Sequence, residues 1–342
     1  MESHKFLDLW NDIKEVFDEV IKKYDGEWML RKRSIDTRFL LCFILQIIIP
    51  KDHRGYGVTL VEIFNQFLNL GLPSVSKRAL AASSLCEARQ KLNPLIFKEL
   101  NGKIIAKWEQ YNDKPAVWNS HRFLGVEGSK FSLPGELIIQ GYKTPGDHAH
   151  YPQGLVSGMY DLLTGIPYDF DMVNHNNERM CVIRHLEQGF QKNAVHVYDR
   201  GYFSFEVLFD HLKNAAHAVF RLQKNTGYQV IEEFWNSKNT DEIVALQPPM
   251  SVLKLVRDKN LDIDLNPKEV RLIKYIIGEA SYVLCTTLVD KIKYPTEIFP
   301  DVYHSRWGVE EMYKVSKVIT GVQDFHSKSE SGCKQELFAH FL

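Results

Sequence analysis

The chain has 342 residues, of which 44% are hydrophobic and 25% charged, and its formal net charge is −1. This composition excludes a disordered or low-complexity chain and predicts a globular protein with a large buried core. The longest apolar run, residues 39–49, is about half of the roughly 20 residues that cross a bilayer, so we expect a buried helix there. The N-terminus shows no basic start before an apolar stretch, so no secretory signal is visible and a cytoplasmic protein is expected.

The charge is unevenly spread along the chain. Residues 1–120 hold 18 Lys and Arg against 15 Asp and Glu, whereas the remaining residues hold 24 against 28. The net charge of the whole protein therefore indicates no particular partner, and any binding of nucleic acid has to come from local basic patches. Five widely spaced cysteines without a C-x-x-C pair argue against a disulfide framework or a cysteine zinc site.

The first part of the chain, residues 1–118, is predicted to be a helical region. Apolar residues recur at intervals of three and four over residues 11–23, 37–49, 59–70 and 94–111. Ser83 and Ser84, followed by Glu87, predict a further helix that starts with a capping box.

From residue 121 the period of the apolar residues changes to that of strands. Residues 123–126 are a short apolar strand, and two strands at 154–161 and 165–172 turn through residues 162–165. Then follow a helix at 178–191, a strand at 194–198, a helix at 203–214 and a strand at 218–222. An antiparallel start followed by alternating strands and helices predicts a mixed α/β sheet.

Residues 223–299 are more polar and predict a β-rich insertion. Candidate strands lie at 228–234, 251–256, 270–277 and 281–288. The helical pattern returns at 302–319, and another helix is expected at 335–342.

Four polar side chains share one face of the helix expected at 302–319. At about 100° per residue, an arc of only about 60° holds them: Tyr303, Arg306, Glu310 and Lys317. A carboxylate flanked by two cations suits a place where a metal ion meets a phosphate, with Glu310 on the metal and the cations on phosphate oxygens. An exposed helix with ordinary ion pairs, such as Arg306 with Glu310 at i,i+4, explains the same spacing equally well.

Two further acids follow strands. Asp199 comes directly after strand 194–198 and Glu127 directly after strand 123–126, places where ligands and metals gather in α/β sheets. Asp199 alone reads more readily as a turn or helix-capping residue. Converging with Glu310, however, these acids can hold two Mg²⁺ ions roughly 3.5–4 Å apart, which clamp the attacking and leaving oxygens of a phosphodiester. Nucleotide-hydrolase, dinucleotide, serine-hydrolase and zincin motifs are absent from the sequence.

Together these segments resemble the DDE transposases of the insertion-sequence four family. The family signature Y-x2-R-x3-E-x6-K is complete from Tyr303 to Lys317, and VYDRGYFS at residues 197–204 is similar to the second-acid block. The blocks at 126–134, 158–165, 177–186 and 218–225 follow in the family's order, and SSLCEARQKL at 83–92 is similar to a stretch of its N-terminal region. The resemblance covers residues 37–342.

The resemblance implies a fold and a site. It implies an α/β, ribonuclease H-like catalytic domain at 119–342 with a β-rich insertion at about 223–299, preceded by a helical region at 1–118 that binds DNA ends. The implied catalytic and metal-binding acids are Glu127, Asp199 and Glu310, with two Mg²⁺ ions that Mn²⁺ can replace. The implied DNA-binding residues are Tyr303, Arg306, Lys317, Arg221 and Arg200.

The resemblance also implies a reaction and a partner. Such enzymes cut double-stranded DNA at the inverted repeats of their element and join the freed 3′-hydroxyl to target DNA. The implied state is a homodimer on DNA, associated with the nucleoid in the cytoplasm. The basic runs Arg31-Lys32-Arg33 and Lys77-Arg78 are candidates for end binding, although such runs are more often solvated surface.

Two features depart from the family pattern. The family's first acid is an Asp in a D-G-S block, whereas this chain has Glu127, which is one methylene longer. Only 32 residues follow Glu310, fewer than family members usually carry, so a truncated copy is expected. These departures leave a second reading open, namely an impaired or repurposed remnant that binds DNA without cutting it. A ribonuclease H-like nuclease unconnected with transposition is a third.

Overall fold

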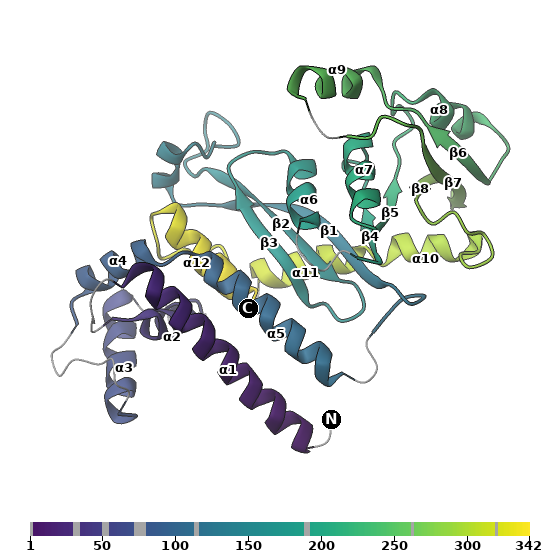
Figure 1. The fold of residues 1–342 in the computed structure, drawn as a ribbon. Coiled ribbons are helices and arrows are strands. Elements are labelled where there is room, and N and C mark those ends of the chain that lie inside the picture. The colour runs from purple at the N-terminus through teal and green to yellow at the C-terminus, as the bar shows by residue number, and fades with distance from the viewer. Residues whose placement is uncertain are drawn as a thin grey trace.

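The computed structural model describes residues 3–29, 35–49, 55–71, 80–112, 116–187, 192–260, 263–318 and 321–342. Helices gather at the N-terminal side of the molecule, and an eight-stranded sheet with its own helices forms the rest (Figure 1). The basic runs Arg31-Lys32-Arg33 and Lys77-Arg78 lie outside the described residues. Within those ranges no helix combines the length and the apolar character needed to span a membrane.

The described part of the chain has five helices before the sheet, which confirms the helical prediction for this region. They are α1 (Ser3–Trp28), α2 (Thr37–Ile47), α3 (Tyr56–Asn69), α4 (Ala82–Lys91) and α5 (Leu95–Tyr111). α2 begins where the Asp36 carboxylate accepts a hydrogen bond from the Phe39 N–H, and its apolar residues are buried as expected.

The capping box expected at the start of α4 is wrong. The helix begins at Ala82, with Ala81 as its extended N-cap residue and without a side-chain capping bond. Ser83 and Ser84 therefore lie inside the first turn, where the backbone is already helical and a capping geometry is no longer possible.

The core of the sheet has the predicted mixed topology. In the order β3-β2-β1-β4-β5, the strands β1 (Arg122–Ser132), β2 (Gln153–Asp161) and β3 (Pro167–Val173) are antiparallel neighbours. β4 (Ala194–Tyr198) lies parallel to β1, and β5 (His217–Arg221) lies parallel to β4. The connecting helices are α6 (Glu178–Leu186) and α7 (Phe205–Lys213). This order and these directions are those of a ribonuclease H-like sheet.

Residues 223–299 extend this sheet instead of forming a separate one. β8 (Ala280–Thr286) pairs with β5, and β7 (Lys268–Ile277) and β6 (Asp241–Leu246) follow toward the edge. The strands predicted at 228–234 and 251–256 are wrong, because these residues lie in α8 (Gln229–Asn236) and α9 (Met250–Lys259). Short apolar runs fit either period, and tertiary packing decides between them. The division into domains at 1–118 and 119–342 stays a prediction.

Both faces of the core sheet are covered. Val195 and Val197 of β4 pack toward α10 (Phe299–His304), whereas Ala194 and Tyr198 pack toward α6 and α7. α11 (Trp307–Val318) crosses β1 closely, since a Cβ added at Gly125 would lie 2.5 Å from the Val309 Cγ2 atom. Glycine at this position therefore lets the helix approach the strand.

The last helix, α12 (Glu330–His340), lies beside the N-terminal helices (Figure 1). Arg89 of α4 is 4% exposed and pairs with Glu336 at 2.9 Å, and its Nε donates to the Gln335 side chain at 3.1 Å. Residues from both ends of the chain thus share one buried core with one face of the sheet.

Candidate active site

Parallel pairing of β1 and β4 brings two of the three candidate acids to one end of the sheet. Gly125 of β1 lies opposite Val197 of β4. Two residues further on, Asp199 follows the end of β4 as predicted, whereas Glu127 lies inside β1 and does not follow a strand that ends at residue 126. The two acids are therefore at neighbouring positions. Because side chains alternate along a strand, Glu127 points to the same face as Gly125, which is the face covered by α11.

The third acid comes from the corner between α10 and α11. The single helix expected at 302–319 is interrupted by a turn at Ser305 and Arg306. The Arg306 guanidinium is 4% exposed and donates hydrogen bonds to the Glu127 carboxylate and, at 2.7 Å, to Glu310 Oε1. The i,i+4 ion pair of the alternative reading is thus present, but the arginine is buried and binds two acids, unlike a residue of a solvated helix face.

Tyr303 and Lys317 reach residues beside the acids from the two sides of this corner. The Tyr303 hydroxyl donates to Asp199 Oδ1 at 2.8 Å. The Lys317 ammonium donates to Ser129 Oγ at 2.7 Å and to the Lys130 carbonyl at 2.8 Å. The four signature side chains therefore converge although the helix that was expected to align them is broken.

A hollow of about 250 Å³ lies over these groups. Its lining residues come from β1, the end of β4 and α11: Glu127, Gly128, Ser129, Asp199, Glu310, Tyr313, Lys314 and Lys317. All three candidate acids thus face one hollow.

Burial and neighbouring charges shift the pKa values of Glu127 and Asp199 in opposite directions. Burial raises the pKa of Glu127 to about 7, although Arg306 opposes the rise, and the charge of Asp199 adds to it. Burial also acts to raise the pKa of Asp199, but hydrogen bonds from the Arg200 N–H and the Tyr303 hydroxyl outweigh it and leave that pKa below its usual value. At neutral pH one carboxyl group can therefore hold a proton while its neighbour stays ionised.

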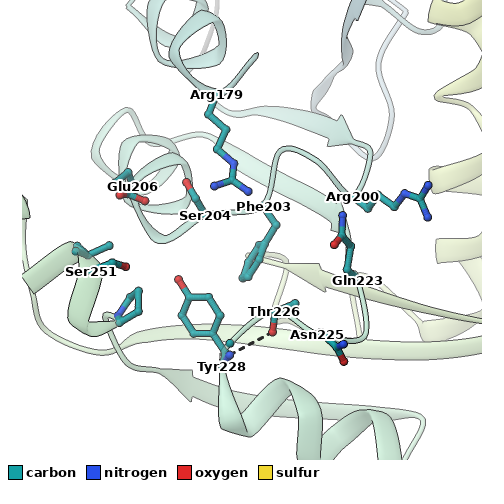
Figure 2. Close-up of a pocket in the computed structure, with 13 residues that line it drawn as sticks. Arg179, Arg200, Phe203, Ser204, Glu206, Gln223, Asn225, Thr226, Tyr228 and Ser251 are labelled. Atoms are coloured by element: carbon teal, nitrogen blue, oxygen red, sulfur yellow. Dashed lines mark hydrogen bonds between the residues drawn. The ribbon is translucent and has the colours of Figure 1, made fainter. Parts of the chain in front are cut away.

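The other two arginines expected to bind DNA lie in different places. The Arg221 side chain of β5 packs on Tyr282, with its Cζ atom 4.7 Å from the ring centre, and its Nη1 atom lies 3.9 Å from Asp199 Oδ1. Arg200 lines a separate polar pocket of about 400 Å³ together with Arg179. In Figure 2 the Arg179 side chain points into this pocket and the Arg200 guanidinium points away from it.

Sequence reasoning missed Tyr313. Its buried hydroxyl lies 3.0 Å from the carbonyl oxygens of Glu127 and Val156, so it ties α11 to β1 and β2 beneath the hollow. A tyrosine on the apolar face of a helix gives no signal different from core packing, and only its position three residues after Glu310 was available.

The donor chemistry of the site fits a hard divalent cation. Carboxylate oxygens are the ligands that Mg²⁺ and Mn²⁺ prefer. As the side chains lie, however, the described residues contain no group of three acids, histidines or cysteines placed to hold one ion. Arg306 takes the place of a cation between Glu127 and Glu310, and its buried Nε has no hydrogen-bond partner. The residues therefore fit the metal by chemistry, and binding requires the carboxylates to turn from Arg306.

Residues 118–342 match the family model described as a transposase DDE domain. The chain belongs to this family. The matched region runs from the strand that carries Glu127 to α12, so the DDE domain includes the three acids and the corner that carries Arg306.

The chain is also similar to one known protein sequence and to one solved structure. Transposase InsG for insertion sequence element IS4 from Escherichia coli (strain K12) is 22% identical over 302 residues, which are 85% of this chain and 64% of that protein. The chain thus spans less than two thirds of that relative's length. The cryo-EM structure of the piggyBac transposase synaptic complex with hairpin DNA matches with a TM-score of 0.40 and 12% identity, covering 98% of this chain and 75% of that one.

Proposed function

We propose that this chain acts as the transposase of an insertion sequence, cutting DNA strands at the ends of its element and transferring them to target DNA. One observation carries the proposal: Glu127, Asp199 and Glu310 line one hollow in a chain of the transposase DDE domain family. Phosphoryl transfer needs positioned charge more than covalent chemistry, and the hollow concentrates titratable groups of both signs.

The three acids are proposed to hold two Mg²⁺ ions, or Mn²⁺ in their place. The metal supplies a positive charge for the attacking and leaving oxygens of the phosphodiester. Of the chain's own groups, the Tyr303 hydroxyl fixes the orientation of Asp199. Arg306 holds Glu127 and Glu310 until a cation replaces it, and its guanidinium is then able to bind a phosphate.

Double-stranded DNA is the proposed partner, both as inverted-repeat ends and as target. Lys317 and Arg221 lie at the acids and are proposed to bind the phosphates beside the cut. Arg200 is proposed to contact DNA further away, from its place at the neighbouring pocket. A homodimer on DNA and an association with the nucleoid in the cytoplasm complete the proposal.

Strand cleavage tests this function directly. The substrate is a labelled duplex that carries the inverted repeat flanking the gene, incubated with the full chain in Mg²⁺ and in Mn²⁺. Asp199→Asn and Glu310→Gln are expected to lower cleavage by at least about 10³-fold, because each removes charge that acts on the transition state. Binding of the same duplex is expected to change little. Unchanged cleavage by both variants would reject the site.

The same assay distinguishes an active transposase from an impaired remnant. Glu127 is bound by Arg306, and Glu127→Asp draws the carboxylate about 1 Å back toward β1. Cleavage by the native chain shows that Glu127 works as it stands. Cleavage only by Glu127→Asp identifies an enzyme impaired at this position, and salt-dependent binding without cleavage by either chain supports a binding-only role.

A further inference from the structure

Glu178, the first residue of α6, places a fourth carboxylate next to the site. Its side chain meets two glycines that follow Glu127 and Asp199 in the sequence. A Cβ added at Gly128 would lie 2.9 Å from Glu178 Oε1, and one added at Gly201 would lie 3.6 Å from Oε2. Because both positions lack a side chain, the carboxylate can approach the middle of β1 and the loop after β4.

Buried contacts fix the position of α6 and therefore of Glu178. His185, on the last turn of the helix, is 1% exposed, and its Nδ1 lies 2.7 Å from Asp169 Oδ2 of β3. At the first turn, Arg179 Nε donates to the Gly201 carbonyl at 3.0 Å. The last turn of α6 is thus tied to β3 and its first turn to the loop after β4, so Glu178 lies on a helix that is held at both ends.

The Glu178 carboxylate has no directly bound partner among the described residues. It is half-buried, and no residue in the described ranges forms a hydrogen bond or an ion pair with its side chain. Burial raises its pKa and the charge of Asp199 raises it further, while the charge of Lys130 opposes the rise without cancelling it. Glu127 and Glu310, by contrast, share a direct ion pair with Arg306. A half-buried carboxylate that faces like charge without a directly bound cation is unfavourable, so an added cation on this side relieves repulsion.

We propose that Glu178 is a fourth acid of the site and binds a divalent cation together with Asp199. This inference rests on the proposed function, because the family implies the metal. Glu178 lines a larger pocket on the α6 side, of about 880 Å³, whose lining includes Gly201. On this proposal Glu178 and Asp199 would hold one cation on the α6 side, apart from the acids that Arg306 binds.

Mn²⁺ binding by the full chain tests the proposal without any cleavage assay. Free Mn²⁺ is followed by electron paramagnetic resonance, with the native chain beside Glu178→Gln, Glu178→Asp and Asp199→Asn. Glu187→Gln is the matched control, since Glu187 is an exposed acid at the other end of α6. We expect Glu178→Gln and Glu178→Asp each to weaken Mn²⁺ binding by about tenfold or more, as loss of a ligand does, and Glu187→Gln to leave it unchanged.

The Asp variant separates a ligand from a mere charge. It keeps the negative charge and withdraws the carboxylate by one methylene, so native affinity in Glu178→Asp would overturn the proposal. Native affinity in Glu178→Gln with a loss in Asp199→Asn would overturn it too, while leaving the proposed function intact. Failure of the native chain to bind Mn²⁺ at all would reject both.

Thermal unfolding gives a second readout that a purely structural role does not reproduce. In EDTA, Glu178→Gln is expected to raise the melting temperature of the chain, because it removes like charge from the cluster. Added Mn²⁺ is expected to raise the melting temperature of the native chain and to raise that of Glu178→Gln less. A lower melting temperature for Glu178→Gln in EDTA would indicate a structural role and contradict the proposal.

Discussion

Two buried arginines, one in the insertion and one in the hollow, are bound in opposite ways. Arg271 of β7 is fully buried and donates to both oxygens of Asp241, to the Tyr294 carbonyl and to the Thr296 hydroxyl. Its Nε and both terminal nitrogens have partners, and it faces one acid. Arg306 has an unpaired Nε and is shared between two acids.

The difference separates a structural ion pair from a site. A buried charge that only stabilises a fold is fully hydrogen-bonded, because each unsatisfied buried group costs free energy. The hollow instead brings Glu127, Asp199 and Glu310 together, and Glu127 and Glu310 share one buried guanidinium whose Nε has no partner. Clustered acids with a raised pKa at Glu127 and an incompletely bonded arginine are typical of a functional site.

The largest loss of stability is expected from substitution of Arg271. Arg271→Met leaves Asp241 without its main partner, and we expect a loss of about 3 kcal/mol in the free energy of unfolding, measured with urea. Lys291→Met is the control, because Lys291 lies 3.0 Å from the same carboxylate but is 45% exposed, and it is expected to cost below about 1 kcal/mol. Equal losses in the two variants would contradict the structural role of Arg271.

Substitution of Arg306 is expected to affect DNA cleavage strongly and stability only slightly. Arg306→Met should lower DNA cleavage by about 10²-fold, the size typical for one positioned charge at a transition state. The free energy of unfolding should change by only about 1 kcal/mol, since the Glu310 side chain is 44% exposed and hydrates easily. Urea unfolding beside the cleavage assay measures both, and a stability loss as large as that of Arg271→Met would make Arg306 a fold residue.

The two regions are also expected to respond to pH with opposite signs. The pKa of Glu127 is raised to about 7, so between about pH 4.5 and 7 the folded chain keeps a proton that the unfolded chain has lost. Its stabilising contribution is therefore complete below this window and is lost as the pH rises through it. Asp241, despite its burial, has a pKa lowered by hydrogen bonds from Arg271 and Thr296, so its contribution is complete above about pH 4 and is lost on acidification.

Urea unfolding in EDTA across pH 4.5–8 checks the first half of this prediction. The native chain is expected to lose about 3 kcal/mol of unfolding free energy relative to Glu127→Gln as the pH rises, since each unit of pKa shift corresponds to about 1.4 kcal/mol. Parallel profiles for the two chains would show that Glu127 is ionised throughout and that the hollow is not electrostatically strained.

Sequence reasoning found the acids and the sheet for definite physical reasons. The position after an apolar run pointed to Asp199 and Glu127, and the fixed spacing from Tyr303 to Lys317 pointed to the third acid. Asp199 does follow the end of β4, whereas β1 continues beyond Glu127 to Ser132. The apolar run of β4 and the hairpin of β2 and β3 followed from period alone. Contacts that depend on packing could not be predicted from the sequence. One is the bond from Arg306, at the turn, to Glu127, which lies 179 residues away in the chain. The other is the close approach of Glu178 to Gly128.

The insertion at 223–299 shows where local sequence pattern fails to predict secondary structure. Segments 228–234 and 251–256 alternate well enough to predict strands, yet Ile231 and Phe234 are buried by packing as one helical face of α8. β6 lies at the edge of the sheet, where only Val244 and Leu246 of its six residues are buried, and so its sequence carries little apolar signal. Local pattern therefore fixed the core strands, which are buried on both faces, better than the elements at the sheet edge.

The smallest effects are expected at Lys274 and Lys317, one on stability and the other on DNA binding. Lys274 of β7 donates to three carbonyls at the end of α8, those of Phe234, Trp235 and Ser237. Lys317 has two acceptors, and burial lowers its pKa. Lys274→Met should cost about 1 kcal/mol in the free energy of unfolding, since it leaves the carbonyl end of a helix without its cation, and should not alter DNA binding.

Lys317→Met should do the opposite. We expect a change in unfolding free energy below about 0.5 kcal/mol, a several-fold loss in affinity for duplex DNA, and a salt dependence of binding that is shallower by about one ion. Fluorescence anisotropy at several salt concentrations measures the slope for both variants. An unchanged slope in Lys317→Met would mean that this lysine serves Ser129 and β1 alone, and the phosphate contacts of the hollow would then have to come from Arg306 and Arg221.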